Sequence, residues 1–381
     1  MTYIYAYFKH LKSDLPSGLV VFLVALPLCL GIAMASGAPL FSGIISGIIG
    51  GIVVGSLSNS HVSVSGPAAG LTAIVLTAIS TLGSFELFLT AVVIAGMIQL
   101  ILGFLGAGSI SNYFPNNVIE GMLAGIGIII FLKQIPHAFG YDPDFEGDVS
   151  FFQLDGQNTF SELFHVLNHV QLGSILITLI SLVILIVWSK IDFLKKIKLV
   201  PPALVAVIVS IVLNEFFIQS GSSLVIATDH LVSLPIPETF DELKDIIITP
   251  DFSAIFNSKV WIVALTIAIV ASIETLLCIE ASDRMDSQKR YTDTNVELKA
   301  QGVGNIVSSL LGGLPMTSVV VRTSANNAAG AKSKMSAIIH GLLLLVSVLS
   351  IPTILNKIPL ATLASVLLLV GYKLANPKTA N

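Results

Sequence analysis

The stretch Pro315-Met-Thr-Ser-Val-Val-Val-Arg-Thr-Ser-Ala-Asn326 begins as an extended-looking run and continues into a segment that carries hydroxyls and one charge. A second stretch of this character is His61-Val-Ser-Val-Ser-Gly-Pro-Ala-Ala-Gly70. Each leads into an apolar segment, 318–331 or 67–82, that is too short or too polar to be an ordinary lipid-facing helix. The two stretches therefore predict two broken helices.

The composition places these broken helices in a membrane. Of 381 residues, 54% are hydrophobic and only 11% are charged, and the mean hydropathy is +0.90. Soluble domains carry about 25% charged residues, so a water-soluble globule of this length is excluded. The 19 basic and 23 acidic residues nearly balance, and no basic run is long enough to follow a phosphate backbone, so nucleic acid is not expected as a partner.

The sequence lacks the motifs that are typical of enzymes. Cys29 and Cys278 both lie in apolar segments, where two free thiols make neither a disulfide framework nor a metal site. The sequence has no Gly-rich phosphate loop, no metal-spaced His/Cys cluster and no nucleophile elbow. We therefore expect no enzyme activity, no metal and no cofactor.

Apolar windows of about 17–25 residues, the length that crosses a bilayer, predict twelve spans. They lie near 17–36, 40–57, 67–82, 85–107, 116–134, 172–189, 202–219, 258–280, 297–313, 318–331, 335–355 and 358–374. Met1–Pro16 lacks the compact apolar core and small-residue site of a cleavable signal peptide, so we expect the first span to be the insertion signal. The glycines of 43–55 form faces of small residues that let helices approach closely.

The positions of Lys and Arg predict the orientation, because cytoplasmic loops retain them. With the N-terminus inside, 14 of the 19 basic residues fall on predicted cytoplasmic segments. The loop 135–170 has six carboxylates and no Lys or Arg, and the loop 220–257 has six carboxylates and one Lys. We expect an inner (plasma) membrane protein of bacterial type, in contact with the lipid bilayer, with both termini cytoplasmic.

The two broken helices predict a site. Non-helical backbone at membrane depth persists only where protein or a water-filled cavity surrounds it. Pro67 suits a first helical position, and the hydroxyls of Thr323 and Ser324 suit a helix start. If the two segments occupy matching places in inverted repeats, their N-termini converge and attract an anion. The alternative is two ordinary helices that composition happens to divide.

One basic and one acidic residue lie inside the predicted bundle. Arg322 is costly there and needs a partner or a role. It is interpreted as a positive element of the anion site or as the permanent ion-pair partner of Glu274, and both can hold in different transport states. Glu274 lies deep in the span 258–280, where a carboxylate suits binding and release of H⁺ or Na⁺.

Three other polar residues are interpreted structurally. His340 lies in an apolar span and is expected to be a satisfied core histidine in preference to a proton relay. Glu120 and Lys133 flank one span near its two ends, and both are expected to snorkel to the interface.

Four stretches of the sequence resemble the SulP/SLC26 family of anion transporters. They are 25–37, 63–70, 272–283 and, most specifically, 300–315 running into Arg322 and 330–333. The resemblance implies an all-α polytopic membrane protein with a seven-plus-seven inverted-repeat fold, a core domain and a gate domain. Two short strands would precede half-helices 3 and 10, an anion would lie between these helices, and access would alternate in an elevator-like manner.

The resemblance also implies a set of site residues. The anion contacts fall at Pro27, Leu28, Ile32, Ala68, Ala69, Thr72, Val319, Val320 and Arg322. The coupling ion falls at Glu274, Cys278 and Ser318. Bicarbonate-transporting members have Asp in place of Glu274, Thr in place of Cys278, and small or hydroxylated residues in place of Val319 and Val320. These departures favour H⁺ over Na⁺ as the coupling ion.

The family's transport domains have fourteen helices, of which we expect about twelve here. The chain is expected to be a single transmembrane transport domain over 1–381, with repeat 1 at about 15–219 and an incomplete repeat 2 at about 258–381. No STAS domain is expected within it.

The expected function is secondary active, H⁺-coupled symport of a small inorganic anion, sulfate or bicarbonate. The alternatives are an anion channel, or a truncated, non-transporting membrane module that needs a partner chain. A homodimer is left open. The run 300–333 disfavours a nucleobase transporter of the same architecture.

Overall fold

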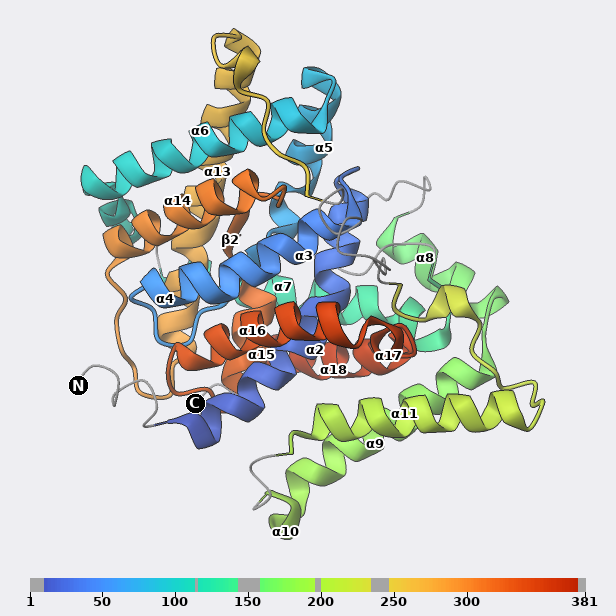
Figure 1. Ribbon diagram of the computed structural model, residues 1–381. Helices are drawn as coiled ribbons and strands as arrows, with labels where there is room; N and C mark the ends of the chain where they lie inside the picture. Colours follow the sequence, from blue (N-terminus) through green and yellow to red (C-terminus); the bar gives the residue numbers. More distant parts are fainter. Residues whose placement is uncertain (1–9, 114–115, 143–157, 196–199, 234–246, 376–381) are drawn as a thin grey trace. The chain divides into compact units, whose positions relative to one another are not determined.

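The computed structural model describes residues 10–113, 116–142, 158–195, 200–233 and 247–375. It divides the chain into two compact units (Figure 1). Unit 1 comprises Met1–Ile119 and Pro235–Leu345, and unit 2 comprises Glu120–Leu234 and Val346–Asn381. Each unit therefore combines a segment from the first half of the chain with a segment from the second half.

Unit 1 is built from helices of both segments. In chain order they are α2 (Leu11–Ala35), α3 (Leu40–Ile49), the π-helix η1 (Gly50–Val54), α4 (Gly55–Leu57), the 3-10 helix η2 (Ala69–Leu71), α5 (Thr72–Leu82), α6 (Phe85–Phe104), η3 (Ala107–Tyr113), η6 (Phe252–Ala254), α13 (Ser258–Met285), α14 (Thr294–Leu310), α15 (Val320–Ala328) and most of α16 (Met335–Ser350). Helix α6 packs along α14 and α13, and α2 packs against α3, α5 and α15 (Figure 1).

Helix α2 lies in the interior of unit 1, since most of its residues are buried. Pro27 lies inside this helix and removes one backbone hydrogen-bond donor from it. A methyl group added to Gly43 of α3 would lie 1.9 Å from the Cys29 carbonyl oxygen, so only a glycine permits the close approach of α3 to α2. The predicted packing role of the small residues in 43–55 is confirmed at this position.

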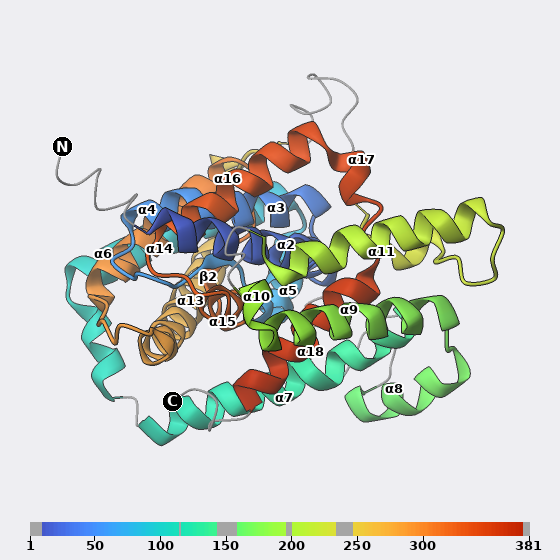
Figure 2. The ribbon, with the colours of Figure 1, turned by 90° about the horizontal axis from the view of Figure 1, so that it is seen from below.

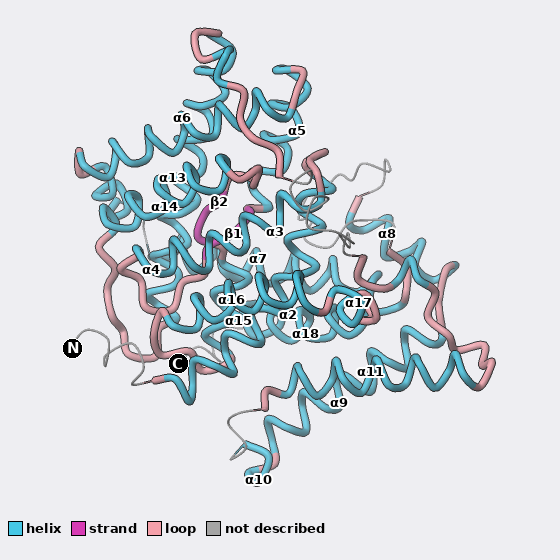
Figure 3. The backbone as a smooth tube through the Cα atoms, in the orientation of Figure 1, coloured by secondary structure: helices cyan, strands magenta, loops and turns pink. Residues whose placement is uncertain are grey.

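Two short strands form a small sheet within unit 1, drawn in magenta in Figure 3. Strands β1 (Ser65–Pro67) and β2 (Met316–Ser318) pair antiparallel, with Ser65 opposite Ser318. Both strands are fully buried, and the predicted extended stretches are confirmed. Because the strands are antiparallel, α5 and α15 leave the sheet from opposite ends, as inverted repeats require. Pro67 lies in β1, so its prediction as a first helical residue is wrong; the helical path begins at Ala69.

Unit 2 is also helical. Its elements are α7 (Asn116–Phe139, of which the first four residues belong to unit 1), α8 (Thr159–His165), η4 (Val166–Asn168), α9 (Leu172–Lys190), α10 (Asp192–Lys195), α11 (Pro202–Gln219), η5 (Thr228–His230), the end of α16, α17 (Pro352–Leu355) and α18 (Leu360–Ala375). Helix α9 packs against α11 and α18, as Figure 2 shows.

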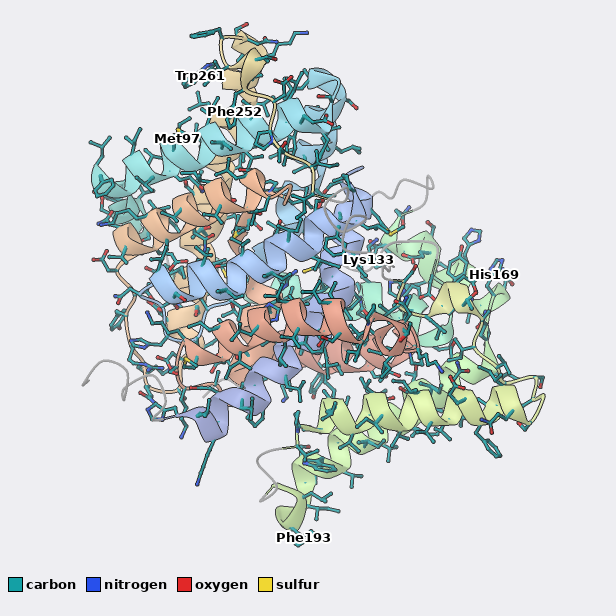
Figure 4. All side chains as sticks on the ribbon, in the orientation of Figure 1. Met97, Lys133, His169, Phe193, Phe252 and Trp261 are labelled. Carbon is teal, nitrogen blue, oxygen red and sulfur yellow. The ribbon has the colours of Figure 1, made fainter. Side chains whose placement is uncertain are left out.

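Both units expose apolar side chains in the way a bilayer requires. Leu179 and Val183 lie one turn apart on α9, and both are exposed. Ile208 and Val212 are likewise exposed one turn apart on α11. Residues four apart lie on one helix face, so these are continuous apolar faces suited to lipid chains. Figure 4 shows the exposed side chain of Met97 on α6 in unit 1.

The predicted spans agree with the helices. Six helices are long and apolar enough to cross a membrane, and four shorter apolar helices accompany them. Together they correspond to ten of the twelve predicted spans. The other two, 297–313 and 318–331, are the helices α14 and α15, which carry buried polar side chains.

Candidate functional site

Two helix N-termini meet the strands without side-chain caps. The N-cap of α15 is Val319 and the N-cap of η2, which leads into α5, is Ala68; neither makes a side-chain cap hydrogen bond. The leading N–H groups of a helix have no partner within it, and they carry the positive end of the helix dipole. The expectation that Thr323 caps α15 is wrong, because its Oγ1 accepts a hydrogen bond from Val64 N at 3.1 Å. Ser324 Oγ donates to Met285 Sδ instead of capping the helix.

Five of the predicted anion contacts lie at these two N-termini. Ala69, Thr72 and Val319 are half-buried and reach the surface of unit 1, whereas Ala68 and Val320 are buried. These residues give the site an apolar wall. On α2, the predicted contacts Pro27, Leu28 and Ile32 are all buried, and Ile32 shares a hydrophobic cluster with Ala68.

Arg322 of α15 lies against strand β1. Its side chain is fully buried, and its Nη2 donates to Cys29 Sγ at 3.3 Å. A methyl group added to Gly66 of β1 would lie 2.0 Å from Arg322 Nη1, so the guanidinium packs directly against the backbone of β1. Nε and Nη1 of Arg322 have no hydrogen-bond partner in the described part of the chain. The positive charge is thus close to the start of the half-helices but is not neutralised there.

Glu274 lies beside η2, the 3-10 helix that leads into α5. A methyl group added to Gly70 would lie 3.0 Å from Glu274 Oε1 and 3.1 Å from Oε2, so the carboxylate lies over Gly70. Oε2 is buried and has no hydrogen-bond partner among the residues that the structure describes. Arg322 and Glu274, both described, are not within ion-pair distance of each other, so the ion-pair interpretation is not met in this structure.

The other two predicted coupling residues are in contact with each other. Ser318 Oγ donates to Cys278 Sγ at 3.3 Å, and both side chains are buried. Cys278 follows Glu274 by one turn of α13, and Ser318 N donates to Thr275 Oγ1 at 3.4 Å. Over the described ranges, no group of three or more His, Cys, Asp or Glu side chains could hold a metal ion.

The sequence reasoning missed a row of polar side chains on α14. Glu297, Gln301 and Asn305 are fully buried and hydrogen-bonded, and two of them contact the strands. The available signal was their spacing of four residues, which puts all three on one helix face.

Two structural interpretations change. His340 is fully buried as expected, but neither ring nitrogen has a hydrogen-bond partner in the described residues, so it is not a satisfied core histidine. Lys133 does not snorkel: it is buried, and its Nζ lies 4.0 Å from Glu162 Oε2 (Figure 4). The side chain of Glu120 lies outside the described residues.

Comparison with known proteins identifies the family. Residues 11–381 match the sulfate permease family. The chain is 30% identical over 374 residues to the putative sulfate transporter YvdB of Bacillus subtilis, covering 97% of this chain and 66% of that relative. It is 26% identical to the bicarbonate transporter BicA of Picosynechococcus sp., covering 96% of this chain and 62% of the relative. The chain thus spans slightly less than two thirds of these relatives' length.

Solved structures show the same fold. The transmembrane domain of a cyanobacterial bicarbonate transporter BicA superimposes with a TM-score of 0.66 at 25% identity, covering 97% of this chain and 91% of that domain. SLC26A9 superimposes with a TM-score of 0.62 at 19% identity, covering 96% of this chain and 58% of that chain. The expected all-α, seven-plus-seven inverted-repeat membrane fold is confirmed, and the relatives are transporters, not enzymes. The chain therefore belongs to the sulfate permease (SulP/SLC26) family of membrane anion transporters.

Proposed function

We propose that this chain forms the membrane part of a secondary active transporter that carries a small inorganic anion, sulfate or bicarbonate, together with H⁺. The names of its relatives supply these two anions. The observation that carries the coupling is the position of the Glu274 carboxylate over Gly70, at the uncapped start of the α5 path. A bound anion would accept hydrogen bonds from the backbone N–H groups at this helix start.

This position makes anion binding and protonation favour each other. Two negative charges about 5 Å apart repel by roughly 3 kcal/mol at an effective dielectric constant of about 20, which is about a hundredfold in affinity. Protonation of Glu274 removes the repulsion. By linkage, a bound anion favours protonation of Glu274 to the same extent, so both load together and leave together.

The sulfur of Cys278 supports H⁺ over Na⁺ as the coupling ion. Cys278 occupies the turn after Glu274, beside Ser318. Hard cations prefer oxygen ligands, and a thiol is a soft ligand. A carboxyl group next to a thiol can bind a proton without any further ligand.

The two compact units support elevator-like alternating access. All predicted anion and coupling residues belong to unit 1, and each unit interleaves segments from both halves of the chain. In the proposed mechanism, unit 1 carries the anion across the membrane as a body. We place the protein in a plasma membrane with both termini cytoplasmic, on the distribution of its basic residues.

The test is uptake of labelled sulfate or bicarbonate into proteoliposomes with an imposed pH gradient or an imposed Na⁺ gradient. We expect the pH gradient to drive accumulation, and Glu274→Gln to abolish accumulation while retaining anion exchange. Glu280→Gln, on the same helix, is the matched control and should retain accumulation. Accumulation by Glu274→Gln would overturn the coupling role, and accumulation driven only by Na⁺ would overturn H⁺ coupling. Downhill flux without accumulation would identify a channel, and no flux would point to a module that needs a partner chain.

A further inference from the structure

A row of three buried side chains lies on the face of α14 that contacts β1 and β2. Glu297, Gln301 and Asn305 follow one another at intervals of four residues, so they lie on one face of the helix. All three are fully buried. A buried polar side chain is costly unless it is hydrogen-bonded, so the partners of these three residues indicate what they do.

Asn305 binds the first residue of β2 through both ends of its carboxamide. Met316 N donates to Asn305 Oδ1 at 2.7 Å, and Asn305 Nδ2 donates to the Met316 carbonyl oxygen at 3.1 Å. This pair of bonds imitates a neighbouring strand. Asn305 Nδ2 also donates to Gln99 Oε1 at 2.7 Å, and Gln99 Nε2 donates to Ser272 Oγ at 3.4 Å. The start of β2 is thereby tied to α14, α6 and α13.

Gln301 binds the first residue of β1. Its Nε2 donates to Ser65 Oγ at 2.6 Å and to Glu297 Oε1 at 2.9 Å. Glu297 in turn accepts a hydrogen bond from Ser58 Oγ through Oε2. One helix face therefore holds the first residue of each strand, although Ser65 and Met316 lie 251 positions apart in the chain.

The strands depend on this support, and their position determines the position of the helices that follow them. A two-stranded sheet is marginal by itself, and each strand here has only three residues. β1 ends at Pro67 and η2 begins at Ala69; β2 ends at Ser318 and α15 begins at Val320. One residue separates each strand from its uncapped helix, so a displaced strand displaces the N–H groups that follow it.

We propose that Gln301 and Asn305 are positioning residues for the anion site: by holding the first residues of β1 and β2, they fix where the N-termini of α5 and α15 point. This inference rests on the proposed function, because it assigns the two N-termini to anion binding. In the described structure, the hydrogen bonds of their side chains go to Ser65, Glu297, Gln99 and Met316, not to the half-buried wall of Ala69, Thr72 and Val319. They act through the strands.

The test compares Asn305→Ala and Gln301→Leu with Ser309→Ala in the complete chain. Ser309 is a matched control because it is buried on α14 one turn beyond Asn305, and its Oγ donates only to carbonyl oxygens of its own helix. Labelled sulfate and bicarbonate uptake gives KM and kcat separately. Amide hydrogen exchange of peptides spanning 314–321 and 63–70 reports on the strands themselves.

We expect Asn305→Ala and Gln301→Leu to raise KM by about tenfold or more with a smaller change in kcat, since the N–H groups lose their fixed placement. We expect exchange to accelerate by about tenfold or more in 314–321 for Asn305→Ala and in 63–70 for Gln301→Leu. Ser309→Ala should leave KM and exchange within about twofold of wild type. Gln301→Leu keeps most of the side-chain volume, so it carries the test alone if Asn305→Ala does not fold.

The possible results separate this inference from the proposed function. Folded variants with KM and exchange near wild-type values would overturn the positioning role. Faster exchange with unchanged KM would also overturn it, because the strands would move without affecting the site. If wild type takes up neither anion, the proposed function fails, and unchanged exchange in the variants would then independently remove the support role of α14.

Discussion

Arg322 carries its charge at a place where no carboxylate neutralises it in the described structure. A buried charge is expensive, and removing one partner of a buried pair usually destabilises a protein strongly. Here the guanidinium contacts a thiol and the backbone of β1, and two of its three nitrogens have no hydrogen-bond partner among the described residues. In the proposed anion site, this positive charge would add to the field of the two helix N-termini.

Arg322→Ala is therefore expected to weaken anion binding by about tenfold or more, since about 1.4 kcal/mol of lost attraction already corresponds to a factor of ten. Equilibrium binding of labelled sulfate and bicarbonate to the purified protein measures this. Arg322→Lys keeps the charge but loses the planar contact with Gly66, so its affinity should lie between those of wild type and Arg322→Ala. Unchanged affinity in Arg322→Ala would remove Arg322 from the anion site.

The sequence identified the individual charged residues better than their partners. Glu274 and Arg322 stand out because a charge in an apolar span is rare. Their contacts could not be predicted, because the helical period places a side chain on a face but does not say which residue of another helix meets that face. Glu297 was overlooked for a related reason: its partner Ser58 is distant in the chain, and only the fold brings the two together.

At the scale of elements, the contact between α2 and α3 depends on Gly43. A methyl group there would lie 1.9 Å from a backbone carbonyl oxygen of α2, which cannot move without moving the helix. We expect Gly43→Ala to lower the thermal unfolding temperature, with a cost at or above the roughly 1–3 kcal/mol typical of overpacking. Gly55→Ala in α4 is the control, because its nearest neighbour would lie at 3.4 Å, an ordinary contact. Equal unfolding temperatures for the two variants would contradict this reading of the helix contact.

The helices themselves were largely predictable, and their internal breaks were less so. Apolar windows located ten of the described helices, because length and hydropathy are what a bilayer demands. The same windows ended the span 258–280 five residues early, because α13 continues to Met285 through polar residues. Helix hydrogen bonds do not depend on hydropathy. The π-helix η1 has no hydropathy signal either.

A second element-scale feature joins three segments of unit 2. Asp142, just after α7, contacts His137 through Oδ1 and lies 2.5 Å from His230 Nδ1 through Oδ2. His230 Nε2 lies 2.6 Å from Gln171 Nε2 and 3.6 Å from Asp229 Oδ2. The hydrogen bond to Asp142 raises the pKa of His230 above its ordinary value of 6.5. Burial by itself would raise the pKa of Asp142, but the hydrogen bonds from the two histidines outweigh it and hold this pKa below 3.8.

These shifts predict a pH-dependent stability of unit 2. The His230 contribution is fully present below pH 6.5 and is lost as the pH rises through the raised pKa. The Asp142 contribution is present above pH 3.8 and is lost as the pH falls through the lowered pKa. Thermal unfolding of wild type and His230→Gln should therefore differ more at pH 5.5 than at pH 8.5. An equal difference at both pH values would refute the assignment to His230.

At the scale of the whole molecule, the chain is ordered by charge as well as by hydropathy. The short loops that join the predicted spans on one side retain most Lys and Arg residues, and the two long loops on the other side are acidic. Insertion favours the basic loops on the cytoplasmic side. Parts of both acidic loops, 143–157 and 234–246, lie outside the described residues, so the orientation is best tested at positions that the structure does describe.

Two exposed aromatic residues of unit 1 allow that test. Phe256 lies in the acidic loop before α13 and is 95% exposed, and Tyr291 lies in the turn after α13, next to Lys289 and Arg290, and is 88% exposed. The two native cysteines, Cys29 and Cys278, are buried, so a thiol reagent should give little background. In intact cells, a membrane-impermeant maleimide should label Phe256→Cys. It should label Tyr291→Cys only after the cells are permeabilised. Because α13 separates the two positions by one crossing, the reverse pattern would place the N-terminus outside, and labelling of both in intact cells would show that α13 does not span the membrane.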